Sequence, residues 1–324
     1  MKIIVGIDIG GTKCAVTFAA PQGDRFDFLD KVKEHTITDS PRQAIARFIT
    51  LIQERLEKNP SWDLAAIGIS CGGPLDAGRG LILAPPNLPL WDNVDIYTPL
   101  KQAFGVPVAM ENDANACALA EWVYGAGKGT RNMVFLTFGT GMGAGLILGG
   151  KLYAGTNDMA GEVGHIRMAQ EGPEGYGKRG SFEGFCSGGG IAKQGCMAAQ
   201  RAFAQGKTVG FCAGPEDLEN ITAQGIAEAL SQGDPWAREI YETVAEKLGM
   251  GLSILIDILN PEVIIIGSIF ARQEQVLRSR MEQVIRREAL SQSAAVCRIC
   301  PPGLGEKIGD YAAVTVGLMK YRNP

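Results

Sequence analysis

The chain of 324 residues lacks a surplus of basic residues, a long apolar run and a secretory leader pattern. With 31 Lys and Arg against 35 Asp and Glu, its net charge of −4 argues against nucleic acid as the main partner. The richest apolar run, GMGLSILIDIL, is short and contains Asp257, which argues against a membrane span. The start of the chain has no small-residue cleavage pattern, and the eight scattered cysteines are expected to stay reduced. We therefore expect a cytoplasmic protein.

The distribution of apolar runs indicates two α/β domains. The length is too great for one small core. The strand-like runs KIIVGIDI and CAVTFAA are separated by two glycines, and NMVFLTF breaks on GTGMGAG before LILGGKLYAG. Each half therefore begins with a glycine-broken hairpin and continues into α/β units, which predicts a duplicated architecture with a cleft. The glycine-rich stretch 160–190 is expected to be a loop.

The hexapeptide DIGGTK places Asp8 in an apolar strand, followed by two glycines. A buried carboxylate is costly unless something compensates for it. Glycines let backbone N–H groups approach an anion, so Gly10 and Gly11 predict a phosphate-binding turn to which Thr12 and Lys13 add donors. Asp8 would then hold magnesium, through water. An ordinary tight hairpin explains these six residues equally well.

FGTGMGAG is a second glycine-rich turn after a strand. Its Gly139, Gly141 and Ala144 match the spacing of the dinucleotide-binding fingerprint, with Asp158 at the distance of a ribose-binding acid. That fingerprint needs a helix after its glycines, whereas GLILGGKLY continues in a β pattern. We therefore predict a second phosphate-binding hairpin.

The segment MENDANACALAE puts Asn112 and Asp113 between a buried strand and a helix. Ligands of α/β folds bind at this end of a strand. Asp113 could act there as general base for phosphoryl transfer to a sugar hydroxyl, or simply cap the helix.

The segment AGEVGHIRM puts Glu162 and His165 in a glycine-flanked loop. The chain has two histidines, and a lone histidine is more often structural than catalytic. Together with Glu183, however, the two residues offer the charge-assisted hydrogen bonds that suit a polyol.

These segments, in this order, resemble the ROK family of sugar kinases (repressors, open reading frames, kinases) over essentially the whole chain. DIGGTK and FGTGMGAG resemble its phosphate motifs, GISCGGPLD its strand with sugar-contacting glycines, END its catalytic segment and GEVGH its signature. The resemblance implies an α/β fold of two ribonuclease-H-like (actin-like ATPase) domains around a cleft. We expect an N-terminal domain at 1–122, joined by the C-terminal helix 308–324, and a C-terminal domain at 123–307.

The resemblance also implies an activity: ATP- and magnesium-dependent phosphorylation of a hexose or hexose derivative, usually at the 6-hydroxyl, by a homodimer or larger homo-oligomer. Asp113 takes the place of the catalytic base and Asp8 that of the magnesium ligand. The sugar-binding places fall on Gly72, Gly73, Asn112, Asp113, Glu162, His165 and Glu183. The nucleotide-binding places fall on Asp8, Gly10, Gly11, Thr12, Lys13, Gly139, Thr140, Gly141 and Gly267.

One departure from the family concerns zinc. Zinc-bearing members have three cysteines in the loop that follows the Gly-His pair, and here Glu174, Tyr176 and Ser181 stand in their places. One histidine cannot hold zinc tetrahedrally, and Cys297 and Cys300 lie far along the chain without a partner pair. We therefore expect no structural zinc, and a loop held by packing and hydrogen bonds.

Two further departures affect the substrates. VIIIGSIF has Ser268 after Gly267, where the adenosine-side motif usually has more glycines, and NLPLWDN has Leu90 where many members have glycine. The loops 85–93 and 155–165 decide between glucose, fructose, mannose, allose and N-acetylated amino sugars, and the donor is ATP or polyphosphate.

Two alternatives remain beside the glucokinase-, fructokinase- or N-acetylhexosamine-kinase-like enzyme. A sugar-responsive transcriptional regulator is disfavoured, because the first strand begins near residue 3, without room for a DNA-binding module ahead of it. A non-catalytic sugar-binding protein is disfavoured because all the phosphate-site residues are present.

Overall fold

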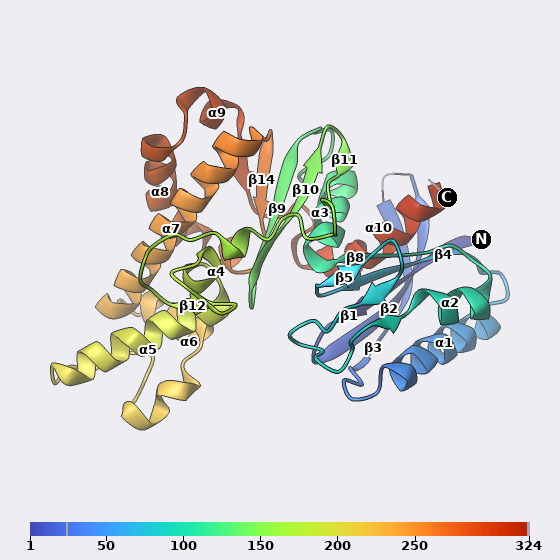
Figure 1. Cartoon of the computed structure of the whole chain (residues 1–324), viewed down its shortest axis with the longest axis horizontal. Helices are drawn as coiled ribbons and strands as arrows, with labels where there is room; N and C mark the ends of the chain where they lie inside the picture. The colour runs from blue at the N-terminus through green and yellow to red at the C-terminus, as the bar shows by residue number, and fades with distance from the viewer. Residues whose placement is uncertain (24, 323–324) are drawn as a thin grey trace. The chain divides into compact units, whose positions relative to one another are not determined.

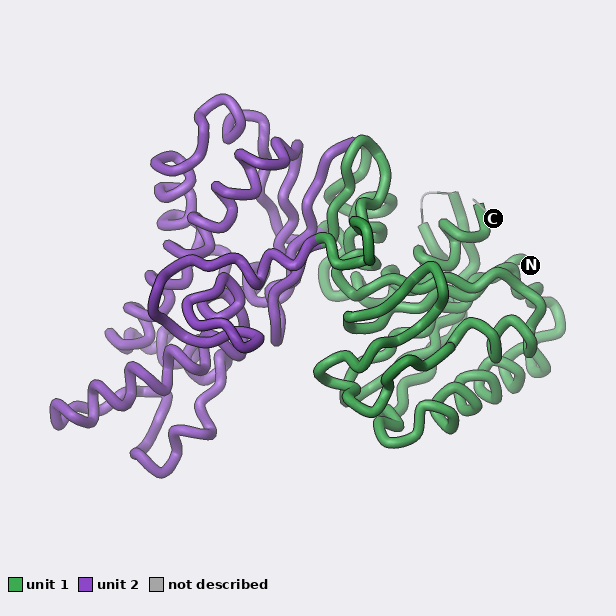
Figure 2. The backbone as a smooth tube through the Cα atoms, viewed as in Figure 1, with its two compact units in different colours: residues 1–129, 145–160, 303–324 green, residues 130–144, 161–302 purple. Residues whose placement is uncertain are grey.

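The computed structural model describes residues 1–23 and 25–322. The chain divides into two compact units (Figure 2). Unit 1 comprises residues 1–129, 145–160 and 303–324, and unit 2 comprises residues 130–144 and 161–302. No sequence pattern predicts that the segment 145–160 belongs to the same unit as residues 1–129.

Unit 1 is built on a five-stranded sheet with the order β3-β2-β1-β4-β8 (Figure 1). The expected glycine-broken hairpin is confirmed: β1 pairs antiparallel with β2, which pairs antiparallel with β3, and β1, β4 and β8 are parallel. The bounds are β1 Lys2–Ile9, β2 Lys13–Gln22, β3 Arg25–His35, β4 Asp63–Cys71 and β8 Val108–Asn112. A small sheet joins β5 (Leu75–Asp76), β6 (Leu81–Ile82) and β7 (Val94–Asp95).

Helices cover both faces of this sheet. On one face, Ile3 and Ile7 of β1 share a core with Phe48 of α1 (Pro41–Lys58). Successive side chains of a strand point to opposite faces, so Ile4 lies in a second core. That second core contains side chains of α10. The remaining helices of unit 1 are α2 (Tyr97–Phe104), α3 (Asp113–Tyr124) and the short η3 (Gly305–Lys307).

The C-terminal helix α10 (Ile308–Arg322) packs closely on the sheet of unit 1. A Cβ on Gly68 of β4 would overlap with the Ala313 carbonyl oxygen and the Gly317 nitrogen of α10. Glycine at this position therefore allows the backbones to approach.

The second five-stranded sheet has the order β11-β10-β9-β14-β15 (Figure 1). Strand β14 is parallel to β9 and β15, and β10 is antiparallel to β11. The bounds are β9 Met133–Phe138, β10 Met142–Leu148, β11 Lys151–Leu152, β14 Val263–Ile266 and β15 Arg298–Cys300. A strand and not a helix follows the glycines after β9, which agrees with our rejection of the dinucleotide fingerprint.

The helices of unit 2 include a long pair, α7 and α8, which lie side by side (Figure 1). The bounds are α4 Phe182–Phe185, α5 Gly188–Ala204, α6 Ala223–Ser231, α7 Pro235–Leu259, α8 Ile269–Glu288 and α9 Ser291–Val296, with the short η2 at Pro215–Asn220. None of the described helices has the length and apolarity that a membrane crossing requires.

The prediction of a loop over 160–190 is wrong in part. The segment contains the short helix η1 (Val163–His165), the hairpin of β12 (Glu174–Gly175) and β13 (Lys178–Arg179), and helix α4. Elements of two to four residues are too short to leave a periodic apolar pattern in a sequence.

Candidate functional site

Two carboxylates lie near the ends of the parallel strands of unit 1. Asp8 lies near the end of β1, in register with Ser70 of β4, and Asp113 directly follows β8. Burial, and then the negative charge of Asp113, raise the pKa of Asp8 to about 6, against smaller opposing effects of Lys31 and of a hydrogen bond with Ser70. Asp8 and Asp113 therefore lie close enough for the charge of one to disfavour ionisation of the other.

Asn112, and not Asp113, caps helix α3. The Oδ1 atom of Asn112 accepts a hydrogen bond from the Asn115 nitrogen at 2.7 Å. Asp113 is the first helical residue, and its Oδ1 accepts from the Ala114 nitrogen at 2.8 Å. Although Asp113 has an exposed surface, the surrounding protein disfavours its charged form and raises its pKa. The capping role is thus filled by its neighbour, and one carboxylate oxygen of Asp113 remains for chemistry.

The donor set at this edge of the sheet fits magnesium. Magnesium in nucleotide sites takes one or two carboxylates and completes its shell with phosphate and water oxygens. Asp8 supplies such a carboxylate, and a cation beside it would offset the burial and the repulsion by Asp113 that raise its pKa. Over residues 1–23 and 25–322, no three His, Cys, Asp or Glu side chains form a metal-binding group. The protein therefore offers a partial shell, which suits an ion shared with phosphates.

The first glycine turn joins β1 to β2 and is held by one internal hydrogen bond and by two bonds from Thr36, which follows β3. The Gly10 nitrogen donates to the Lys13 carbonyl at 3.1 Å, and the Thr36 hydroxyl donates to the Gly10 carbonyl at 2.6 Å. The Thr36 nitrogen donates to the Thr12 carbonyl at 3.0 Å. The N–H group of Gly10, which we had expected to point at an anion, is thus engaged inside the turn.

Asn87 is a further candidate site residue, and it is not among those predicted from the sequence. A Cβ on Gly11 would lie 2.7 Å from the Asn87 Cβ, and a Cβ on Gly72 would lie 3.4 Å from the Asn87 Oδ1. Asn87 therefore stands between the first glycine turn and the glycines expected to contact sugar. The one indication in the sequence was that Asn87 lies in the loop 85–93, which we expected to select the sugar. The side chain of Leu90 in the same loop is exposed.

In unit 2, Glu183 is bonded to the second glycine turn. Its Oε2 accepts from the Met142 nitrogen at 3.0 Å and would lie 2.8 Å from a Cβ on Gly141. On the other side of the turn, the Gly188 nitrogen donates to the Gly139 carbonyl at 2.7 Å. The turn is therefore fixed by α4 and by the start of α5, and a side chain at position 141 would displace the carboxylate.

Glu162 and His165 lie near Glu183. A Cβ on Gly164 would be 3.2 Å from the Glu183 Cβ. Glu162 lies two residues before this glycine and His165 directly after it, and both are exposed. The three residues that the sequence reasoning assigned to a polyol therefore occupy one region of unit 2.

Hydrogen bonds hold the segment in which we expected no zinc. Ser181 is fully buried, and its hydroxyl caps α4 by accepting from the Gly184 nitrogen at 3.1 Å and donates to the Gly175 carbonyl at 3.4 Å. The Lys178 ammonium donates to the His165 carbonyl at 2.7 Å.

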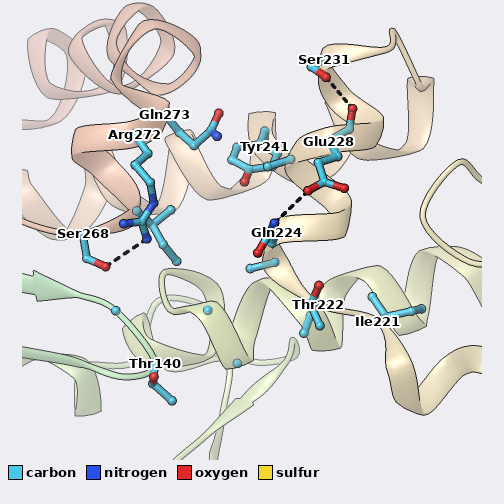
Figure 3. A pocket seen from close by; sticks show the side chains of 17 residues that line it. Thr140, Ile221, Thr222, Gln224, Glu228, Ser231, Tyr241, Ser268, Arg272 and Gln273 are labelled. Carbon is cyan, nitrogen blue, oxygen red and sulfur yellow. Dashed lines mark hydrogen bonds between the residues drawn. The ribbon is translucent and has the colours of Figure 1, made fainter. Parts of the chain in front are cut away.

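A cavity of about 840 Å³ adjoins the second glycine turn and lies within unit 2 (Figure 3). Its lining includes Thr140 of the turn, Ser268 and Arg272 on one side, and Gln224 and Glu228 of α6 on another (Figure 3). Gly267, which we expected to contact a nucleotide, is not part of the lining, and its nitrogen donates to a β9 carbonyl at 2.9 Å.

The predicted site residues thus form two groups. One group, in unit 1, consists of Asp8, Gly10, Gly11, Thr12, Lys13, Gly72, Gly73, Asn112 and Asp113. The other group, in unit 2, consists of Gly139, Thr140, Gly141, Glu162, His165, Glu183 and Gly267.

Comparison with known proteins gives consistent matches along the chain. The sequence profile described as "ROK family" matches residues 4–316. A glucokinase of Streptomyces coelicolor is 33% identical over 270 residues, which cover 82% of each chain. A xylose repressor of Caldicellulosiruptor bescii is 28% identical over 289 residues, which cover 88% of this chain and 70% of the repressor.

Among solved structures, a ROK family glucokinase from Streptomyces griseus in complex with glucose and AMPPNP superposes with a TM-score of 0.77. The two sequences are 28% identical, and the match covers 98% of this chain and 99% of that one.

Proposed function

Because the chain belongs to the ROK family and has the two-domain, actin-like α/β fold of its sugar kinases, we propose that it phosphorylates a hexose or hexose derivative with ATP. The acceptor is the 6-hydroxyl group, and Asp113 is the general base. The observation that carries this proposal is the position of Asp113 at the start of α3, beside Asp8 and released from capping by Asn112.

The reaction needs a base, charge neutralisation and positioning. The sugar hydroxyl oxygen attacks the γ-phosphorus of ATP, the bond from that phosphorus to the bridging oxygen breaks, and ADP leaves. Asp113 takes the hydroxyl proton, and its raised pKa makes it a stronger base while it is still ionised. Asp8 would hold the magnesium ion, which when bound neutralises phosphate charge.

Residues around the acids supply the sugar contacts in this proposal. Because the Oδ1 of Asn112 is committed to the cap, its amide nitrogen is the group left to donate to a sugar oxygen. Asn87, which stands against Gly11 and Gly72, adds a second amide. Glu162, His165 and Glu183 remain assigned to the sugar, and the unit 2 cavity to the nucleotide.

A coupled assay of ADP release tests the proposal. We expect ADP formation from ATP that depends on one of glucose, mannose, fructose, allose or an N-acetylated hexosamine. Repeating the assay with polyphosphate, and measuring sugar phosphate directly, identifies the donor. Absence of sugar-dependent turnover with every sugar and both donors would contradict the proposal.

The similarity to a xylose repressor supports a second candidate, a sugar-responsive regulator. The net charge of −4 is unfavourable for DNA. Fluorescence anisotropy with promoter fragments separates the two functions: we expect no sequence-specific binding, and sugar-sensitive specific binding would favour the regulator.

A further inference from the structure

Arg272 lines the unit 2 cavity and is held by a neighbouring hydroxyl. Its Nη2 donates to the Ser268 Oγ at 3.3 Å, and Figure 3 shows the two side chains together on one side of the cavity. A Cβ on Gly139 would lie 3.7 Å from the same Ser268 Oγ. Ser268 therefore accepts a hydrogen bond from Arg272 and lies near Gly139 of the second glycine turn.

The charge of Arg272 is not neutralised by the protein. No carboxylate lies within ion-pair distance of it in the part of the chain that the structure describes. Elsewhere on the same helix, Arg278 pairs with Glu274, and Arg286 lies 3.9 Å from Glu282. A planar cation that lines a cavity without a carboxylate partner is suited to an anionic ligand.

The backbone at Ser268 is in a conformation that glycine adopts more easily. Its φ is 54° and its ψ is −108°, so the chain bears a conformational cost to keep a side chain there. Backbone strain of this kind is common at ligand-binding positions. The one feature that the serine adds over glycine is the hydroxymethyl group, whose oxygen orients Arg272.

The rest of the cavity indicates how a ligand would lie in it. Glu228 is on a different wall, where its Oε1 accepts from the Gln224 Nε2 at 2.9 Å, and this carboxylate would repel phosphate (Figure 3). Ile221 and Ile269 add apolar surface. Phosphates are therefore favoured beside Arg272 and Thr140, and an uncharged base is favoured on the side of α6.

We propose that Arg272, oriented by Ser268, binds the phosphate chain of the nucleotide donor and makes unit 2 select nucleoside di- and triphosphates over nucleosides. This inference rests on the proposed function, since it assigns the cavity to the donor of that reaction. The ligand is a nucleoside polyphosphate and not a bare phosphate chain, because the apolar part of the cavity would otherwise stay unfilled.

Isothermal titration calorimetry without sugar tests the inference with adenosine, ADP, ATP and tripolyphosphate as probes. We expect Arg272→Ala to weaken ADP and ATP binding by at least about tenfold, because hydrogen bonds to charged groups are among the strong ones, and adenosine binding by less than about twofold. The ADP and ATP affinities of Arg272→Lys should lie between those of the wild type and of Arg272→Ala, since lysine keeps the charge but lacks the paired N–H donors of the guanidinium. Ser268→Gly should weaken ADP binding by a few-fold and leave adenosine unchanged. Arg286→Ala, an exposed arginine on the same helix, is the matched control and should change nothing.

Each contrary outcome is distinct. Equal losses for adenosine and ADP in Arg272→Ala would mean that the arginine only shapes the cavity, and would overturn the inference. Tripolyphosphate binding as tight as ATP, or a wild-type protein that binds no nucleotide, would overturn it as well. Melting temperatures check that the variants fold.

The outcomes also separate this inference from the proposed function. If the wild-type protein binds ADP as expected but phosphorylates no sugar, the proposed function fails and the assignment of Arg272 stands. If sugar is phosphorylated and Arg272→Ala binds ADP normally, only the inference fails.

Discussion

The two sheets repeat one strand order but differ in length and in chemistry. In each, a hairpin is followed by two parallel strands: β3-β2-β1-β4-β8 in the first and β11-β10-β9-β14-β15 in the second. The first hairpin has strands of 8 and 10 residues, whereas the second has strands of 6 and 7. The strand order is therefore duplicated, while the lengths of the hairpin strands and the chemical groups beside the glycine turns are not.

The two units differ in which element supplies the carboxylate beside the glycine turn. In unit 1 a strand itself supplies the acid, Asp8, just before its glycines. In unit 2 the strand before the glycines ends on Phe138, and the carboxylate at the turn is Glu183, from α4. The first turn therefore lies beside acids that repel each other, and the second lies beside an acid that accepts a backbone hydrogen bond.

The largest effect is expected from the replacement Asp113→Asn in unit 1. It removes the proposed base from unit 1, so kcat should fall by at least about 100-fold while sugar affinity changes far less. Steady-state kinetics and calorimetric sugar binding measure the two effects. The exposed Asp39→Asn is the control, and a variant at position 113 that kept most of its turnover would remove Asp113 from this role.

The replacement Asp8→Asn should raise stability while it lowers turnover. Because the pKa of Asp8 is raised from 3.8 to about 6, the folded state binds its proton more tightly than the unfolded state, and ionised Asp8 costs stability as pH rises through this window. The variant should therefore gain about 2–3 kcal/mol in the free energy of unfolding above pH 6, and less at about pH 5. Urea unfolding at the two pH values measures this gain. A loss of stability above pH 6 would show that the charge of Asp8 is already compensated.

The replacement Gly141→Ala tests the second turn. Its Cβ would lie 2.8 Å from the Glu183 Oε2, so the carboxylate must move and its bond to Met142 is lost. If Glu183 contacts the sugar, KM for the sugar should rise by about tenfold. Gly309→Ala in α10, where a Cβ meets nothing within 4 Å, is the control. An unchanged KM would separate Glu183 from sugar binding.

The smallest effect is expected in the segment 174–183. Ser181→Ala removes the cap of α4, so the free energy of unfolding should fall by about 1 kcal/mol. Ser40→Ala is the control, because Ser40 precedes α1 without a side-chain capping bond.

Addition of EDTA should leave the melting temperature of the wild-type protein unchanged; a clear fall would indicate a bound structural metal.

Much of the scaffold could be predicted from the sequence. The glycine-broken hairpins leave clear patterns of apolar residues and glycines, and a strand lies on each side of both glycine turns. The short elements between 160 and 190 leave none. The sequence therefore predicts long elements best.

The site was predicted less fully, for two physical reasons. Which of Asn112 and Asp113 caps α3 depends on backbone dihedral angles that adjacent polar residues do not reveal. The positions of Asn87 beside Gly11 and of Glu183 beside Met142 are tertiary contacts between segments distant in the sequence. The sequence predicts which residues form each glycine turn, but it does not predict which distant residues contact that turn.

Phosphorus NMR of the reaction shows whether the protein transfers phosphate from ATP to the 6-hydroxyl group of a hexose. The wild-type protein, ATP, magnesium and the preferred hexose should yield ADP and a new phosphomonoester signal split by the two hydrogens on C6 of the sugar. Asp113→Asn should produce this signal at least about 100-fold more slowly. Release of inorganic phosphate alone, or no consumption of ATP with any hexose, would contradict the proposed kinase activity.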